Sequence, residues 1–280
     1  MTVRRALDAA AARLAAAGLP SARAEAFTLV SHVVGVPVSR LALVPGLSAE
    51  QAAALEVVLD RRVAGEPVQY ITGIAPFRTT TVTVGPGVFI PRPETECLAG
   101  WAIDVLRFRP GRAVELCAGS GAVAKALVLE AAPSRVWAVE RSAAAFAYLT
   151  ANLAGTGVTP VLADMAVALP ELDGTIDLVV ANPPYLVRSV PLPPDVYADP
   201  AEALYADGDP LDAIRTVATV AARLLVPGGV VGCEHGDDQS GATCAIFTGA
   251  GFTDVTAHTD LVGRPRFVTA RWPMGDMMKM

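Results

Sequence analysis

The sequence has few of the residues that build metal centres and disulfide frameworks. It contains three histidines and four cysteines, and no two cysteines form a C-x-x-C pair. Because structural zinc sites draw closely spaced Cys and His ligands, we expect no metal site. Scattered thiols of this kind are typical of a reducing compartment, so we expect reduced cysteines and a cytoplasmic protein. His235, which follows Glu234 at a predicted strand end, is interpreted as a loop histidine.

Long apolar runs and an excess of basic residues are also missing. No apolar stretch approaches the roughly 20 residues of a membrane span. Asp8 and Arg13 interrupt the alanine-rich N-terminal stretch, which argues against a signal peptide. The net charge is −6 and the pI about 5.1. We therefore expect no membrane contact and no direct binding of nucleic acid, which needs a dense basic surface.

Apolar residues are abundant, and their spacing divides the chain into three parts. Hydrophobic residues make up 52% of the sequence and charged residues 18%, enough for a sizeable core. Residues 1–65 predict a small bundle of amphipathic helices, near 3–17, 21–35 and 48–65, which end at or just before Gly18, Gly35 and Gly65. Residues 66–92 contain the β-branched stretch "FRTTTVTVGPGVFI", which predicts a connecting β-hairpin turning at Gly-Pro-Gly. Residues 93–280 form the third part.

Strand-like and helix-like segments alternate through the third part. This alternation predicts an α/β fold with a doubly wound, mostly parallel sheet. The final two strand segments are joined by a short link without a helix, so we expect the last strand to be antiparallel. The predicted strands are "RAVELC", "RVWAVE", "VTPVLAD", "TIDLVVA", "GGVVGCE", "FTDVTAHTD" and "RFVTARW".

A glycine-rich turn follows the first of these strands. In "VELCAGSGAVA", Gly119 and Gly121 lie between strand and helix, where the backbone can approach a ligand closely. Glu140 ends the next strand 21 positions after Gly119, which suits a carboxylate that accepts from ribose hydroxyls. The pattern favours a nucleoside cofactor over an ordinary tight turn. Ala124 fills the third position of a dinucleotide fingerprint, so this loop alone leaves NAD open, whereas the Gly-Lys-Ser/Thr of a nucleotide triphosphate loop is absent.

Two residues after the third strand are candidates for the base of that nucleoside. Asp164 is placed to accept from an adenine amino group, and Met165 could pack on the ring. The alternative for Asp164 is a helix N-cap.

The fourth strand ends in "NPPY". A conjugated amino group is a poor nucleophile and must be held with its N–H bonds directed. Asn182 can offer its side-chain oxygen and Pro183 its carbonyl, while Pro183 and Pro184 keep the backbone rigid and Tyr185 stacks on a flat substrate group. This favours methyl transfer to a planar amide or amine by positioning, with S-adenosylmethionine as donor. The alternative is a proline-rich turn.

These motifs resemble the protein-(glutamine-N5) methyltransferases that modify peptide-chain release factors. "IPRPETE" followed by "NPPY" is specific to that family, whereas "NPPY" alone is shared with adenine-N6 methyltransferases. The resemblance implies a Rossmann-like class I S-adenosylmethionine-dependent methyltransferase sheet, a protein substrate with a Gly-Gly-Gln loop, and an N-terminal domain that recognises it. The matching blocks are "GEPVQYITG", "GPGVFIPRPETE", "LCAGSGAVA", "ANPPY", "ALYADGDPLDAI" and "GRPRF".

The resemblance also implies roles for single residues. The cofactor site would be lined by Glu115, Cys117, Ala118, Gly119, Ser120 and Gly121, with Glu140 on the ribose, Asp164 and Met165 beside the adenine, and Asn182 reaching the same site. The substrate glutamine amide would be held by Asn182, Pro183, Pro184 and Tyr185, and the wall of the site shaped by Arg92, Pro93 and Glu94. For Glu94 and Glu96 the alternative is that they only open a helix.

The chain departs from the family pattern at three places. Glu115 stands where aspartate is common, and its extra methylene would leave a carboxylate near the amino-acid end of the cofactor. Met165 replaces a tryptophan, and "PFRTTTVTV" lacks an expected Phe-Tyr-Gly. These departures keep open a paralogue acting on a different protein glutamine. Adenine-N6 methylation, cofactor binding without turnover and, more distantly, a dehydrogenase are the other hypotheses.

Overall fold

The computed structural model describes residues 1–188, 191, 194–206 and 208–274, and the chain forms two compact units. Unit 1 contains Met1–Ile74 together with the short helix η3 (Pro194–Ala198), and unit 2 contains most of the rest. Asp207 of "ALYADGDPLDAI" lies outside the described residues. Among those described, no helix has the length and apolarity needed to cross a bilayer.

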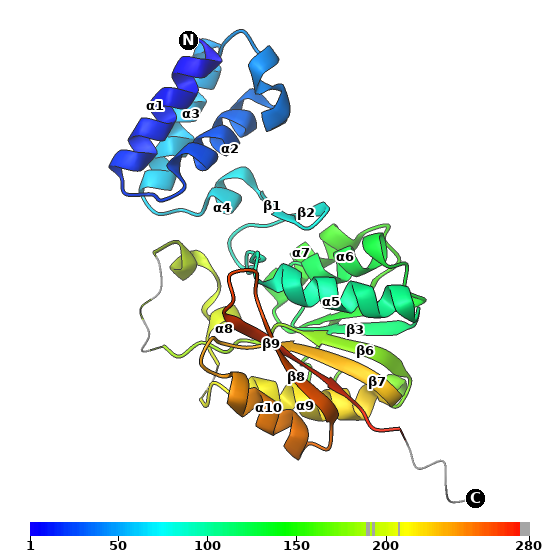
Figure 1. Cartoon of the computed structure of the whole chain (residues 1–280). Coiled ribbons are helices and arrows are strands. Elements are labelled where there is room, and N and C mark those ends of the chain that lie inside the picture. The colour runs from blue at the N-terminus through cyan, green and yellow to red at the C-terminus, as the bar shows by residue number, and fades with distance from the viewer. Residues whose placement is uncertain (189–190, 192–193, 207, 275–280) are drawn as a thin grey trace, which may run out of the picture. The chain divides into compact units, whose positions relative to one another are not determined.

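Unit 1 is a helical bundle, as the apolar periodicity predicts (Figure 1). The Thr2 hydroxyl caps the first helix, and Ser48 and Gln51 form a capping box on the third. Gly35 ends the second helix with a left-handed φ of 76°. The elements are α1 (Val3–Ala16), α2 (Ala22–Val34), η1 (Val38–Leu43), α3 (Ala49–Val63) and the unpredicted short α4 (Val68–Thr72). Their apolar faces meet in one core that includes Leu14, Leu29, Val30, Leu55 and Leu59.

The connecting hairpin exists, but the predicted turn is wrong. The strands are β1 (Ile74–Phe77) and β2 (Thr80–Thr83), so the chain turns at Arg78 and Thr79, and Gly-Pro-Gly lies in the loop beyond. Arg78 has a φ of 51°, and its contacts hold it there: its N–H donates to Glu96, and its guanidinium pairs with Glu130 at 2.8 Å. Glu96 is therefore engaged by the hairpin.

Unit 2 is built on a seven-stranded sheet in the order β5-β4-β3-β6-β7-β9-β8. The first five strands in this order run parallel, and β9 is antiparallel to both neighbours, as predicted for the last strand. The strands are β3 (Arg112–Leu116), β4 (Arg135–Glu140), β5 (Thr159–Leu162), β6 (Ile176–Ala181), β7 (Leu225–Glu234), β8 (Thr253–Thr259) and β9 (Pro265–Arg271).

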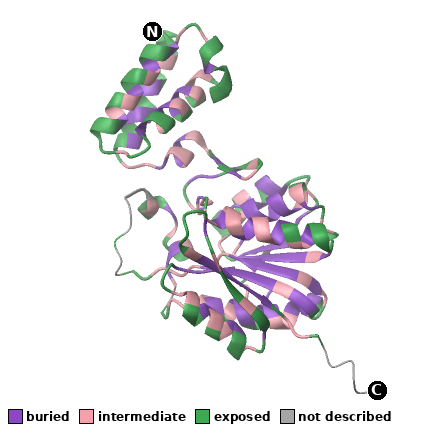
Figure 2. Cartoon of the chain, viewed as in Figure 1, coloured by how far each residue is buried: buried purple, intermediate pink, exposed green. Residues whose placement is uncertain are grey.

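Helices cover both faces of this sheet, with α5, α6 and α7 on one side and α9 and α10 on the other (Figure 1). The central strands are buried along most of their length (Figure 2). The predicted α/β fold with a mostly parallel sheet is confirmed. The helical elements are α5 (Thr95–Phe108), α6 (Ala122–Glu130), α7 (Ala143–Leu153), η2 (Pro170–Leu172), α8 (Ala201–Leu204), α9 (Asp212–Leu224) and α10 (Ser240–Gly249).

Candidate active site

The carboxyl ends of four neighbouring parallel strands bring the candidate residues together. Strand order reverses between β3 and β6, because the chain proceeds from β3 to β4 on one side and later places β6 on the other. In open α/β sheets, ligands bind at such a switch point. The loop after β3, Glu140 at the end of β4, Asn182 after β6 and Glu234 at the end of β7 all lie at this edge.

The loop after β3 is shaped by left-handed backbone. Cys117 has a φ of 57°, Gly119 of 53° and Gly121 of 78°. A Cβ on Gly119 would meet nothing within 4 Å, so open space lies beside it, whereas a Cβ on Gly121 would lie 2.7 Å from Leu149 Cδ1. Gly119 thus faces space that a ligand can occupy, and Gly121 lets α6 pack on α7.

Glu140 is tied to that loop. Its Oε2 accepts from the Gly119 N–H at 2.8 Å and its Oε1 from the Ser142 N–H at 2.7 Å, and the residue is only 8% exposed. Each carboxylate oxygen can accept a second hydrogen bond, so the group can still take a ribose hydroxyl. The predicted register of Glu140 with the glycine loop is present in the fold.

Glu115 points inward instead of lying free beside the loop. Its Oε2 accepts from the Ala124 N–H at 2.8 Å, and the side chain is buried. Burial raises the pKa of Glu115 to about 8, against the lowering effect of the Ala124 bond. The carboxyl fixes the first turn of α6.

Cys117 and Met165 contact each other at this edge of the sheet. The Cys117 Sγ lies 3.6 Å from the Met165 Sδ. Burial raises the pKa of Cys117 to about 12, so the thiol stays protonated and apolar at neutral pH. Asp164 is exposed and accepts from the Ala166 N–H at 2.8 Å, which is the turn-capping geometry weighed as its alternative. Among the described residues, the Asp164 Oδ2 accepts no hydrogen bond, so it could take one from a ligand.

Asn182, Pro183 and Tyr185 lie directly beyond β6. The Asn182 Nδ2 donates to the Thr95 Oγ1 at 3.2 Å, and the Tyr185 hydroxyl donates to the Glu234 Oε1 at 3.0 Å. Within the described part of the chain, neither the Asn182 Oδ1 nor the Pro183 carbonyl oxygen takes part in a hydrogen bond. Two rigid acceptors are thus present where an amide could donate its two N–H bonds.

Three polar residues behind this motif were missed as site residues in the sequence. Glu234 is 2% exposed, Thr95 4% and Arg266 8%. Arg266 pairs with Asp237 at 2.6 Å and lies beside the Tyr185 hydroxyl. The only signal for Glu234 was its place at a predicted strand end. The neighbouring His235 is fully buried, with Nδ1 2.8 Å from the Gly236 carbonyl oxygen, so the loop-histidine interpretation missed its burial.

The predicted wall residues take different positions. The Arg92 guanidinium pairs with buried Asp199, which also accepts from the Ile90 N–H at 3.1 Å. Pro93 is exposed, and Glu94 occupies the N-cap position of α5 without making a capping bond. Arg92 therefore has a structural ion pair in addition to its predicted role. Within the described residues, no group of three or more His, Cys, Asp or Glu could hold a metal ion.

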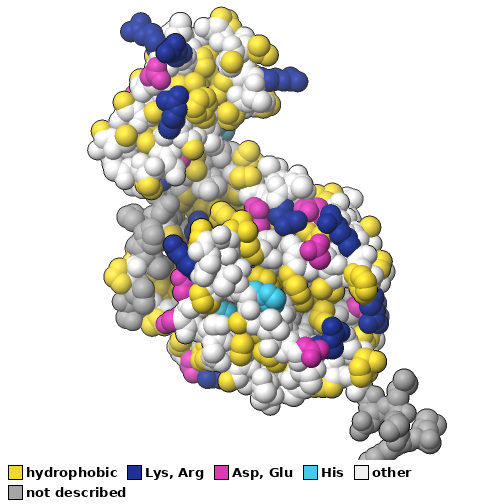
Figure 3. Space-filling model, viewed as in Figure 1, with side chains coloured by type: hydrophobic (Ala, Val, Ile, Leu, Met, Phe, Trp, Pro, Cys, Tyr) yellow, Lys and Arg dark blue, Asp and Glu magenta, His cyan; other side chains and the backbone are white. Residues whose placement is uncertain are grey.

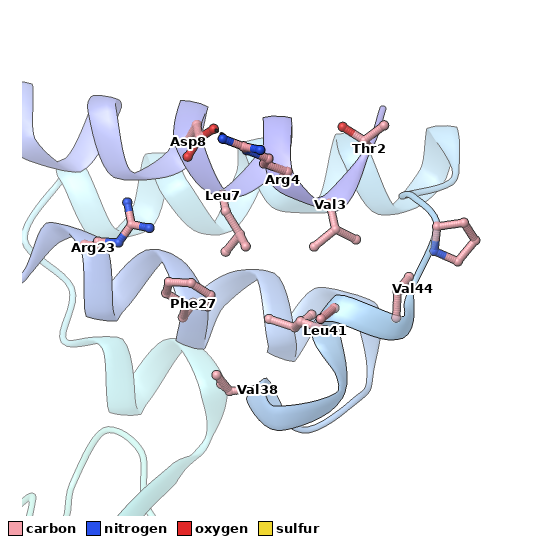
Figure 4. Close-up of a pocket in the computed structure, with 12 residues that line it drawn as sticks. Thr2, Val3, Arg4, Leu7, Asp8, Arg23, Phe27, Val38, Leu41 and Val44 are labelled. Atoms are coloured by element: carbon pink, nitrogen blue, oxygen red, sulfur yellow. Dashed lines mark ion pairs between the residues drawn. The ribbon is translucent and has the colours of Figure 1, made fainter.

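Unit 1 carries a separate hollow of about 650 Å³ between α1, α2 and η1. Figure 4 shows Leu7, Phe27 and Leu41 facing it, with the basic side chains of Arg4 and Arg23 at its margin. Arg23 lies 5.7 Å from the centre of the Phe27 ring. Basic and hydrophobic side chains also lie together on the bundle surface in Figure 3.

Comparison with known proteins shows the family to which this chain belongs. The family model described as the PrmC N-terminal domain matches residues 5–73. The release factor glutamine methyltransferase of Mycolicibacterium smegmatis (strain ATCC 700084 / mc(2)155) is 47% identical over 272 residues, which cover 96% of this chain and 97% of that protein. The chain belongs to the release factor glutamine methyltransferase family. The predicted family is therefore confirmed, and the chain is an S-adenosylmethionine-dependent methyltransferase.

Two further proteins are similar to this chain. The 4-amino-L-phenylalanine/4-methylamino-L-phenylalanine methyltransferase of Streptomyces pristinaespiralis is 37% identical and covers 89% of this chain and 88% of that protein. The solved hMettl16 catalytic domain in complex with MAT2A 3'UTR hairpin 6 has a TM-score of 0.54 at 16% identity, covering 71% of this chain and 77% of that one. The second likeness shows the fold alone.

The residues at the sheet edge fit the cofactor of this family. The open space beside Gly119 and the Glu140 carboxylate suit a ribose, and the apolar Met165 and protonated Cys117 suit a flat base. The sequence has no Gly-Lys-Ser/Thr phosphate-binding loop, and no residue suited to hydride transfer accompanies the glycine loop. A nucleoside cofactor without a polyphosphate therefore fits these residues best.

Proposed function

We propose that this site methylates the side-chain amide nitrogen of a glutamine in a protein, and that the protein is a peptide-chain release factor. One observation carries the proposal: among the described residues, the Asn182 Oδ1 and the Pro183 carbonyl oxygen accept no hydrogen bond, and both lie beside the glycine loop. S-adenosylmethionine, when bound, supplies a methyl group activated by a positive sulfur.

The protein's own part in the reaction is orientation. An amide nitrogen is a weak nucleophile because its lone pair is delocalised into the carbonyl group. The two acceptors direct both N–H bonds of the glutamine amide and so fix the amide plane, which leaves the nitrogen lone pair perpendicular to that plane and clear of both acceptors. As the nitrogen gains the methyl group and positive charge, its N–H bonds become better donors, so both hydrogen bonds strengthen in the transition state, and one of the two protons is then lost to water.

Tyr185 and Pro184 complete the substrate side of the site in this proposal. The hydrogen bond from the Tyr185 hydroxyl to Glu234 anchors the far end of the ring, which leaves its face for the planar amide. We further propose that Glu140 holds the ribose, that Asp164 and Met165 lie at the adenine, and that Arg92, Pro93 and Glu94 border the substrate.

The helical bundle of unit 1 is proposed to recognise the protein substrate. Its hollow has an apolar floor around Leu7, Phe27 and Leu41, and Arg4, Arg23 and Asp8 also line it. Because Arg4 pairs with Asp8 at 4.0 Å, Arg23 is the basic side chain that would favour an acidic residue next to an apolar segment of the substrate.

The test uses labelled S-adenosylmethionine and release factors that carry Gly-Gly-Gln or Gly-Gly-Ala. We expect label on the first protein only, and mass spectrometry should place one methyl group on the glutamine. Equal label on both proteins would refute the glutamine assignment. Methylation of 4-amino-L-phenylalanine or of bare RNA or DNA in place of the protein would show that the substrate is not a protein glutamine.

A further inference from the structure

The buried carboxyl of Glu234 stands directly beside the proposed catalytic motif. Strands β6 and β7 are parallel neighbours, and Ala181 is in register with Cys233. The next residues therefore lie side by side at this edge, with Asn182 directly after β6 and Glu234 as the last residue of β7. The proposed reaction uses Glu234 only to anchor the Tyr185 ring, yet the side chain is 2% exposed, and burying an acid is costly.

Two chains of contact lead from Glu234 to the motif. The Tyr185 hydroxyl donates directly to the Glu234 Oε1 at 3.0 Å. The Thr95 hydroxyl lies close enough to the same carboxyl to influence its pKa, and it accepts from the Asn182 Nδ2 at 3.2 Å. The Oε2 atom makes no hydrogen bond of ordinary geometry within the described residues.

The direction of these hydrogen bonds matters because an asparagine amide has two unlike ends. An ionised carboxylate can only accept, so any hydrogen bond that forms between Thr95 and Glu234 uses the hydroxyl hydrogen of Thr95. The Thr95 oxygen then presents lone pairs to Asn182, and only the Nδ2 end of Asn182 can bond to them. The Oδ1 end is thereby turned to the other side, where the substrate amide needs an acceptor.

We propose that Glu234 is a positioning residue that sets, through the Thr95 hydroxyl, which end of the Asn182 amide faces the substrate. The inference rests on the function proposed above for Asn182. It assigns Glu234 no contact with the substrate or the cofactor. A neutral Glu234 could donate, and Thr95 could then donate to Asn182 and allow the amide to flip. The substrate N–H would meet a donor in place of an acceptor.

The same arrangement predicts a pH response. Burial raises the pKa of Glu234 to about 7, opposed by hydrogen bonding from Thr95 and Tyr185. The thiols of Cys97 and Cys233 have raised pKa values and stay neutral near pH 7, and burial lowers the pKa of His235. The charged and titratable groups facing the carboxyl are Tyr185 after β6, Glu94 and Cys97 at α5, Cys233 and His235 on and after β7, and Arg266 on β9.

The kinetic test compares Glu234→Gln with Glu171→Gln, an exposed control in η2. At pH 8 we expect Glu234→Gln to lower kcat about 10- to 100-fold, with the cofactor Kd changed by less than about 2-fold. Wild-type kcat should fall as pH drops through about 7, since protonation removes the fixed acceptor, and Glu234→Gln should lack that step. Thr95→Val should behave like Glu234→Gln, and Thr95→Ser should restore most of kcat relative to Thr95→Val.

A second readout needs neither substrate nor cofactor. In the full-length protein, the Asn182 side-chain NH₂ resonances should shift with the same midpoint as the Glu234 carboxyl carbon, and Thr95→Val should uncouple them. Full kcat with an unchanged pH profile in Glu234→Gln, or Asn182 resonances that ignore the titration, would overturn the proposal. If wild-type enzyme leaves Gly-Gly-Gln unmodified while the resonances remain coupled, the proposed function fails and the positioning role stands.

Discussion

At the scale of single residues, the two asparagines of the chain should behave in opposite ways. Asn182→Ala removes one of the two proposed acceptors, so we expect kcat to fall about 100-fold or more with little change in cofactor affinity. Asn152 instead holds parts of the fold together: its Oδ1 accepts from the Thr83 N–H, and its Nδ2 donates to the carbonyl oxygens of Thr83 and Ser120. Asn152→Ala should lower the melting temperature. Calorimetry and single-turnover kinetics separate the two effects, and an equal loss of cofactor binding in Asn182→Ala would contradict its role.

Glu115 should make stability depend on pH. Its pKa is raised to about 8 in the folded state, above its unfolded value, so its contribution is present at low pH and is lost as pH rises to about 8. The shift corresponds to about 4 kcal/mol at most between pH 5 and 9. Glu115→Gln keeps an acceptor for the Ala124 N–H and should flatten the dependence. Urea unfolding of the ligand-free protein across this range measures it, and parallel curves for both proteins would refute the assignment.

At the scale of elements, we expect the two glycines of the loop after β3 to differ: Gly121 should matter for helix packing and Gly119 for cofactor binding. Gly121→Ala would place a Cβ 2.7 Å from Leu149 Cδ1, at a positive φ, so we expect a loss of about 1–3 kcal/mol of stability. Gly119→Ala would place its Cβ in open space at a similar φ, so the added methyl group should obstruct mainly the bound cofactor. Thermal melts and cofactor Kd values for both variants test this, and a larger stability loss for Gly119→Ala would contradict it.

Sequence patterns sufficed for the elements whose signals are local. The helices of unit 1 follow from apolar periodicity and from glycines such as Gly35, and the βα units follow from alternation. The hairpin turn was misplaced because Gly-Pro-Gly is a strong local signal, whereas the left-handed Arg78 is held by Glu96 and Glu130, which are distant in sequence.

The same distinction divides the candidate site. Gly119, Glu140 and Asn182 could be proposed as site residues because each lies at or just after the end of a strand, in a recognisable motif. Thr95, Glu234 and Arg266 meet only when α5, β7 and β9 come together, so no window of the sequence contains their relation. Their burial, at 8% exposure or less, is a property of tertiary packing.

At the scale of the whole molecule, the bundle should affect long substrates alone. Phe27→Ser removes an aromatic side chain from the hollow of unit 1, so we expect KM for an intact release factor to rise about 10-fold. Activity on a short Gly-Gly-Gln peptide should stay within about 2-fold, because the peptide lacks the further segment that the hollow is proposed to bind. Phe108→Ser, at a side chain 94% exposed in unit 2, is the matched control. An equal change on protein and peptide would argue against substrate recognition by the bundle.

The placement of β9 has a consequence for the order in which the protein becomes functional during synthesis. β9 pairs Phe267 with Glu234 and brings Arg266 beside Tyr185, although it is the last strand to leave the ribosome. Until then, β7 is an open edge, which invites pairing with other chains. A product that stops before residue 265 therefore carries the glycine loop and "NPPY" but lacks the strand that closes the network behind them. We therefore expect a chain truncated before residue 265 to be inactive, because β9 would be absent behind the candidate site.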